Sequence, residues 1–186
     1  MKYLSILGLF LVITSCQKDT RFLIAKNKLG NLNHTSKVYQ IDSLLANDSV
    51  VKTNARNAFG GTLTSVVEDI KVYDTSEKQI LNIKPFGSMD TLSKIRSIRV
   101  LTEKYKTKNG IGLGSTYKDL KTFYDVNSIQ SLANSFIITL KDINVVVSFD
   151  RKVLPGEVRF DMEADIKPTM IPDDAKINRI WVNFSD

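Results

Sequence analysis

The sequence predicts an α+β fold, a single domain of mostly antiparallel β-sheet with two short amphipathic helices. Short apolar runs rich in Ile and Val recur along the 186 residues, separated by Gly, Pro and Asn turns. Only residues 35–45 and 116–124 have the apolar spacing of a helix. A hydrophobic content of 42% and a charged content of 25% are typical of a globular protein with one core.

The first predicted elements are a short buried strand at residues 22–25 and an Asn-rich turn at residues 27–33. A helix is predicted next, capped by Thr35 or Ser36. Its apolar face is formed by Val38, Ile41, Leu44 and Leu45.

Strands fill the middle of the chain. Residues 49–73 are predicted to form two strands around the Gly60-Gly61 turn. Residues 80–83 form a further strand, which Pro85 stops. Residues 95–105 are rich in Ile and Val and predict a long strand.

The second helix has the clearest local signal. Thr116 is expected to be its N-cap, with Asp119 as the capping-box partner. Its apolar face is formed by Tyr117, Leu120, Phe123 and Tyr124. Gly110, Gly112 and Gly114 precede it and fit either a flexible turn or an anion-binding loop, although the Lys-Ser/Thr ending of a phosphate loop is missing.

The last part of the chain is predicted to be mostly strand. Residues 136–140 and 145–149 predict a hairpin, residues 158–166 alternate strictly between apolar and polar, and residues 177–184 close the domain. A strand, a turn and a short capped helix with one apolar pattern occur in both halves, so an internal duplication is an open alternative.

The N-terminus resembles a bacterial lipoprotein signal. Lys2 is followed by the apolar residues 4–13 and then by Thr14-Ser15-Cys16. The apolar run is half the length of a membrane-spanning helix, so residues 1–15 are interpreted as a signal peptide. The mature chain then begins at Cys16, with diacylglycerol on sulfur and an acylated amine. The alternative is an ordinary signal peptide cleaved elsewhere, which leaves Cys16 as a free thiol.

This interpretation predicts attachment to a membrane through lipid. Two or three acyl chains make attachment effectively permanent, since each buried methylene contributes about 0.8 kcal/mol. Residues 16–21 form a tether that reaches at most about 17 Å, and residues 22–186 form the domain. Net charge falls from +6 to +5 when Lys2 is removed. No nucleic-acid-binding motif is present, so nucleic acid is not an expected partner.

Few residues suggest catalysis. His34 is the only histidine, and its position among asparagines indicates an exposed turn. The sequence contains no zinc motif, and no metal or other cofactor is expected. Any catalytic role would fall to carboxylates.

Three carboxylates alternate in the predicted strand at residues 158–166. Asp161, Glu163 and Asp165 would share one face of that strand. Such a face is most often simply solvated, but it could also bind a cation or a basic partner, or supply the acid pair of a glycosidase.

Lys104, Lys106 and Lys108 alternate in the same way, and Lys94, Arg96 and Arg99 precede them. Lysines on an edge strand commonly prevent association between sheets. A basic face toward lipid headgroups, or cross-strand pairing with the carboxylates, is the alternative.

Residues 98–101 and 107–120 resemble a strand–glycine-loop–helix segment of sigma-E-regulated outer-membrane lipoproteins, and residues 171–182 resemble their closing segment. The resemblance covers residues 80–184. It implies an outer-membrane lipoprotein whose domain has no assigned function and no catalytic residues. Gln17-Lys18-Asp19 after the cysteine is similar to lipoproteins of Bacteroidota.

The favoured hypothesis is a non-enzymatic interaction module that binds an envelope protein or polymer near the outer membrane. A lipoprotein that binds a small ligand is the second hypothesis. A hydrolase that uses Asp161, Glu163 or Asp165 is the third.

Overall fold

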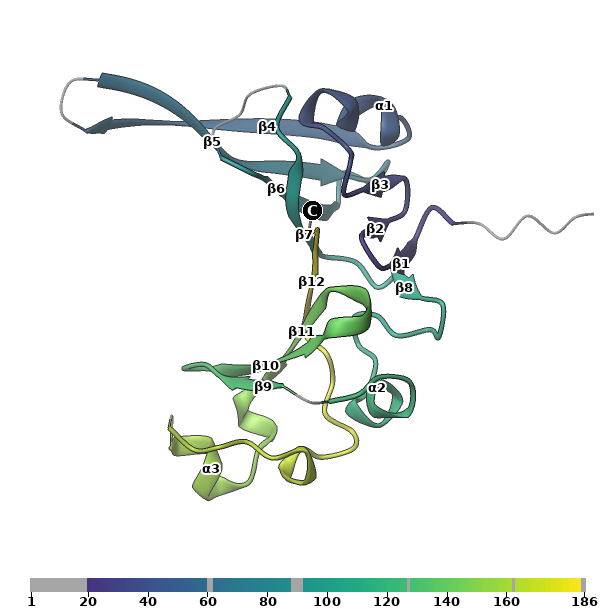
Figure 1. Cartoon of the computed structure of the whole chain (residues 1–186), viewed down its shortest axis with the longest axis vertical. Coiled ribbons are helices and arrows are strands. Elements are labelled where there is room, and N and C mark those ends of the chain that lie inside the picture. The colour runs from purple at the N-terminus through teal and green to yellow at the C-terminus, as the bar shows by residue number, and fades with distance from the viewer. Residues whose placement is uncertain (1–19, 60–61, 88–91, 127, 162, 185–186) are drawn as a thin grey trace, which may run out of the picture.

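The computed structural model describes residues 20–59, 62–87, 92–126, 128–161 and 163–184, and only the backbone of residues 54–59 and 62–68. These residues form one α+β domain with two β-sheets (Figure 1). No helix in the described ranges is both long enough and apolar enough to cross a bilayer.

The large sheet has eight strands, and each neighbouring pair is antiparallel. Its spatial order is β4-β5-β6-β7-β12-β11-β10-β9. The strands are β4 (Ser49–Phe59), β5 (Thr62–Tyr73), β6 (Gln79–Pro85), β7 (Ile95–Val100), β9 (Ile129–Ser131), β10 (Ser135–Leu140), β11 (Val145–Asp150) and β12 (Arg179–Asn183).

The small sheet has the order β3-β2-β1-β8, and its β1–β8 pair is parallel. Its strands are β1 (Leu23–Ala25), β2 (Lys28–Leu29), β3 (Leu32–Asn33) and β8 (Lys106–Thr107). The α-helices are α1 (Ile41–Leu44), α2 (Tyr117–Phe123) and α3 (Gly156–Phe160). Single 3₁₀ turns are found at Val38–Gln40, Lys141–Ile143, Arg151–Val153 and Pro168–Met170.

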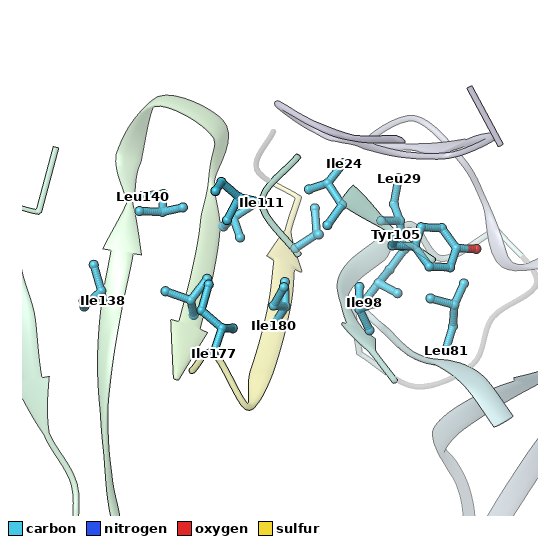
Figure 2. Packing of buried hydrophobic residues seen from close by; sticks show 14 of the residues in the cluster. Ile24, Leu29, Leu81, Ile98, Tyr105, Ile111, Ile138, Leu140, Ile177 and Ile180 are labelled. Atoms are coloured by element: carbon cyan, nitrogen blue, oxygen red, sulfur yellow. The ribbon is translucent and has the colours of Figure 1, made fainter. Parts of the chain in front are cut away.

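The core lies between the large sheet and a layer formed by α1, the small sheet and α2 (Figure 1). Ile24 and Leu29 of the small sheet lie over Leu81 and Ile98 of the large sheet (Figure 2). Burial raises the pKa of the Tyr105 phenol to about 12, so this core side chain stays neutral. The opposite face of the large sheet carries none of this layer.

The large sheet consists of two similar halves. Four consecutive strands, β4–β7, follow α1, and four consecutive strands, β9–β12, follow α2. The two sets meet where Val100 of β7 pairs with Ile180 of β12. The sheet order is therefore the same when it is read inward from either edge.

Hydrogen bonds repeat between the halves as well. The first helical turns are tied to the segment before each inner strand, Val38 N–H donating to Ser93 O and Tyr117 N–H to Ala175 O. The Ser36 hydroxyl accepts from a backbone N–H at 3.0 Å, and the Ser115 hydroxyl does the same at 3.0 Å. The similar sequence patterns thus correspond to a structural repeat.

The Thr116 cap is confirmed. The Thr116 hydroxyl accepts from Asp119 N–H, and the Asp119 carboxylate accepts from Thr116 N–H. Hydrogen bonds from the Thr116 side chain and backbone lower the pKa of Asp119. Tyr117 and Leu120 are buried as expected, but Phe123 is 51% exposed.

The first helix differs from its prediction at the start. Lys37, not Thr35 or Ser36, is the residue before the first helical turn, and Gln40 accepts from Lys37 N–H. Ser36 is buried and bonds the preceding turn instead. The helix is also short, since only a 3₁₀ turn and four α-helical residues are formed.

The prediction of a strand at residues 158–166 is wrong. The segment forms the end of α3 and an irregular stretch, and Phe160 is 81% exposed. No neighbouring strand pairs with the described residues of this segment. The carbonyls of Val158, Arg159 and Asp161 accept from the buried Arg151 guanidinium.

The long strand predicted at residues 95–105 ends early. It leaves the large sheet after Val100 and turns through residues 101–104. Tyr105 then enters the core, and Lys106 N–H donates to the carbonyl of Phe22, the residue before β1. The chain changes sheets because the second sheet offers β1 as a new partner.

Candidate functional site

The face of the large sheet that points away from the helices is called the bare face. Strand alternation places side chains of Lys71, Asn82, Arg99 and Trp181 there, because their neighbours along each strand are buried. These residues form a continuous row, since Lys71 pairs with Asn82, Asn82 with Arg99, and Arg99 with Trp181. Figure 1 shows both ends of the large sheet bending away from the helical layer, so the bare face lies inside the curve.

A polar pocket of about 390 Å³ lies on the bare face. It is formed where β5, β6, β7 and β12 run side by side. We call this the central pocket, and its lining residues are Asp69, Asn82, Lys84, Arg96, Ser97, Arg99 and Trp181. It is adjacent to the junction between the two halves of the sheet.

A β-bulge in β7 builds this pocket. Lys84 pairs with Ser97 but the next residue, Pro85, pairs with Ile95, so Arg96 has no partner across the strand pair. The bulge puts Arg96 and Ser97 on the same face, whereas a regular strand would place them on opposite faces. Arg96 thereby joins Lys84 and Arg99.

The central pocket has an excess of positive charge. Its carboxylate, Asp69, lies 3.9 Å from the Lys84 ammonium. The Arg99 guanidinium lies 5.9 Å from the Trp181 ring centre. In the described part of the chain, neither Arg96 nor Arg99 has a carboxylate partner. Two uncompensated guanidinium groups beside an aromatic ring favour an anionic ligand.

Two acceptor atoms in the same pocket are unpaired. Asp69 Oδ1 and Asn82 Oδ1 are buried and accept no hydrogen bond. The 3.9 Å separation of Asp69 and Lys84 is an ion pair but is too long for a hydrogen bond. Buried polar atoms normally have partners, so these two are expected to accept from a ligand or water.

The arrangement suits binding better than catalysis. The pocket lining contains no histidine or cysteine, and its carboxylate faces a lysine instead of a second carboxylate. Over the described ranges, no three His, Cys, Asp or Glu side chains are grouped to hold a metal ion.

A larger cavity of about 640 Å³ beside α3 is less suitable as a binding site. Its central charge, Arg151, is buried and already bonded to four backbone carbonyls and the Ser131 hydroxyl. A ligand would therefore have to compete with contacts that hold the fold.

The carboxylates predicted from the sequence do not share a strand face. Asp161 ends α3, and its side chain accepts from Glu163 N–H at 3.0 Å. Asp161, Glu163 and Asp165 are all exposed in an irregular segment. These carboxylates therefore lack the shared strand face on which a cation site or an acid pair was predicted. A function for the three carboxylates remains a prediction.

The predicted row of lysines is also divided. Lys104 lies in a turn and pairs with Asp74 at 3.2 Å, Lys106 lies in β8, and Lys108 lies in the following turn. Cross-strand pairing with the carboxylates at 161–165 does not occur. Cys16 lies outside the described residues.

Backbone requirements explain the three glycines near α2. Gly110 and Gly114 have φ angles of 82° and 79°, which favour glycine. A Cβ on Gly112 would lie 2.5 Å from the Tyr105 carbonyl oxygen. The first N–H groups of α2 are already used, since Tyr117 N–H and Lys118 N–H donate to carbonyls of the 173–175 segment. An anion site at this loop is therefore not supported.

The sequence did not identify the central pocket. In the sequence, Arg96 and Arg99 are only positive charges that precede the lysines. The bulge that turns Arg96 toward Arg99 depends on the register between β6 and β7. The available signal was the combination of these arginines with the only tryptophan, Trp181.

The fold has a match among solved structures. The crystal structure of the uncharacterized protein YfeY from Escherichia coli has a TM-score of 0.56 and 14% sequence identity, and the match covers 87% of this chain and 99% of YfeY. No family model and no curated protein matches the chain. At this identity the similarity establishes the fold alone.

Proposed function

We propose that the chain is a lipid-anchored, non-enzymatic binding protein of the bacterial envelope, which binds an anionic envelope protein or polymer through the bare face of its large sheet. The observation that carries the proposal is the bulge-built central pocket, where Arg96 and Arg99 lack carboxylate partners. An anionic group would supply the missing charge, and donors next to it would bond Asp69 and Asn82.

The anchor rests on the sequence. A basic residue, an apolar run and Thr14-Ser15-Cys16 favour lipid attachment at Cys16. Gln17 follows the cysteine, and we propose the outer membrane as the location. Because β1 begins at Leu23, seven residues after Cys16, its partner would be an envelope component close to a bilayer.

Crosslinking in intact cells tests this proposal. A photoreactive residue would replace Lys71, which lies on the bare face next to Asn82. We expect it to capture a specific partner, and we expect Arg96→Gln with Arg99→Gln to abolish that capture. Lys118→Gln is the control, since Lys118 is an exposed residue of α2, in the layer that covers the opposite face of the sheet. Capture that survives the double substitution, or that falls equally with the control, contradicts the proposal.

A small anionic ligand in the same pocket is the second candidate. The volume of about 390 Å³ falls within the range of small-molecule sites. The only tryptophan of the chain lines the pocket, so its fluorescence reports occupancy. Saturable quenching by glucuronate that disappears with Arg99→Gln would favour this candidate, whereas capture of a macromolecule would favour the first.

A further inference from the structure

A second basic surface lies on the outer side of the small sheet. Residues 26–34 and 104–112 form most of this sheet and its turns, and they contain no Asp or Glu. Lys28 of β2 and Lys106 of β8 lie on either side of β1. Lys26 and Lys108 lie in the adjoining turns, and all four lysines are exposed. We call these four residues the lysine surface.

The lysine surface is not neutralised by the rest of the described chain. The nearby ion pairs join Arg21 to Asp48 at 2.8 Å and Lys104 to Asp74 at 3.2 Å. These two carboxylates are thereby paired with other cations. None of the four lysines has a carboxylate partner in the described ranges.

The position of this surface in the fold is informative. Ile24 and Leu29, on the inner side of the small sheet, pack on the covered face of the large sheet (Figure 2). The outer side therefore points away from the large sheet. The lysine surface and the bare face are on opposite sides of the molecule.

The chain enters the fold beside the lysine surface. The described residues begin at Thr20, three residues before β1. Three residues separate Cys16 from Thr20, so four residue steps span at most about 14 Å when fully extended. A lipid at Cys16 would hold this surface within reach of the headgroups.

We infer that the lysine surface rests on an anionic bilayer, so that the central pocket faces away from the membrane. Each lysine near an anionic membrane surface contributes on the order of 1 kcal/mol, and the effect decays within a Debye length. Four unpaired lysines and an adjacent tether would therefore orient the domain as well as hold it. The anchored orientation rests on the proposed lipid at Cys16, whereas the affinity for anionic lipid does not.

The test uses the mature chain from residue 16 with Cys16→Ser, which lacks both the apolar signal peptide and the acyl anchor and so isolates the surface. The fraction of protein that sediments with phosphatidylcholine vesicles would be compared with the fraction that sediments with vesicles containing 30% phosphatidylglycerol. Both are measured in low and in high salt. We expect preferential binding to the anionic vesicles and loss of this binding in high salt. Equal binding to both vesicle types would overturn the inference.

Substitutions localise the effect. Replacing Lys26, Lys28, Lys106 and Lys108 with Gln should lower partitioning into anionic vesicles roughly tenfold or more. The matched control replaces Lys118, Lys152, Lys167 and Lys176, which are also exposed, and should keep most of the binding. An equal loss in both variants would overturn the inference. If thermal melting shows that the fourfold variant does not fold, the double variant Lys28→Gln with Lys106→Gln is used in its place. Mass spectrometry of the native Cys16 tests the anchor separately.

Discussion

The two halves of the large sheet share the same strand order and pairing but differ in what their polar side chains bond to. In the ladders, Asn82 pairs with Arg99 in the first half, and Ser148 pairs with Arg179 in the second. Each pair lies on the bare face, and both Asn82 Oδ1 and Ser148 Oγ are buried without a hydrogen bond. The repeat thus extends to the polar positions at the centre of the sheet.

The difference lies at the ends of the middle strands. In the first half, Lys84 and the bulged Arg96 point into the central pocket. In the second half, Asp150 caps a 3₁₀ turn through Lys152 N–H, and Arg151 is buried against backbone carbonyls. In the second half these charged side chains bond to the backbone of the same half, whereas in the first half they remain available to a ligand.

The largest expected effect comes from Arg151→Ala. This substitution leaves the carbonyls of Leu132, Val158, Arg159 and Asp161 without their donor. Each unsatisfied buried group costs about 1–3 kcal/mol, so we expect a loss of roughly 3–5 kcal/mol in the free energy of unfolding, measured in urea. Arg99→Ala, in the first half, should cost less than about 0.5 kcal/mol. Similar losses for both substitutions would contradict the contrast between the halves.

Ile41 and Leu120 occupy matching positions in α1 and α2, and both are 0% exposed. Either residue changed to Ala should lower the free energy of unfolding by roughly 2–5 kcal/mol, since each leaves a cavity under its helix. Equilibrium unfolding of both variants measures the two losses in the free energy of unfolding. A negligible cost at Ile41 would show that the short first helix does not share the role of the second.

The caps of the two helices should respond differently to acid. Gln40 caps the first helix and does not titrate, whereas Asp119 caps the second with a pKa held below its usual 3.8. A lowered carboxyl pKa contributes stability that is complete above pH 3.8 and is lost as the pH falls through the folded pKa. Asp119→Asn should therefore reduce the urea midpoint at pH 7 and flatten its decline below pH 4. An unchanged decline would place the acid sensitivity elsewhere.

The smallest effect on stability is expected in the central pocket. Arg96→Gln with Arg99→Gln should change the free energy of unfolding by about 0.5 kcal/mol or less, because neither guanidinium has a carboxylate partner in the described chain. Thermal melting measures this change. A loss of several kcal/mol would mean that these arginines hold the fold, and their role in binding would then need another explanation.

Local signals predicted the local structure well. The Thr116–Asp119 cap is confirmed because its contacts lie within four residues of each other. The turn at Gly60-Gly61 lies between the two strands predicted around it, although its own geometry is outside the described residues. The α+β class follows from many such segments, so single errors did not change it.

The errors arose where distant residues decide the structure. Residues 158–166 alternate like a strand, but Arg151 supplies the hydrogen bonds that a partner strand would have given. The central pocket depends on a bulge and on the meeting of β7 with β12, about 80 residues apart in sequence. Neither the register nor the bulge is visible in a single strand.

The most direct measurement compares crosslinking from matching positions of the two halves. Lys71 of β5 and Ile137 of β10 are both half-buried bare-face residues next to Asn82 and Ser148, respectively. With a photoreactive residue at each position in intact cells, we expect partner capture mainly from position 71, and we expect Arg96→Gln with Arg99→Gln to abolish it. Equal capture from both positions, unchanged by these substitutions, would contradict the proposed function.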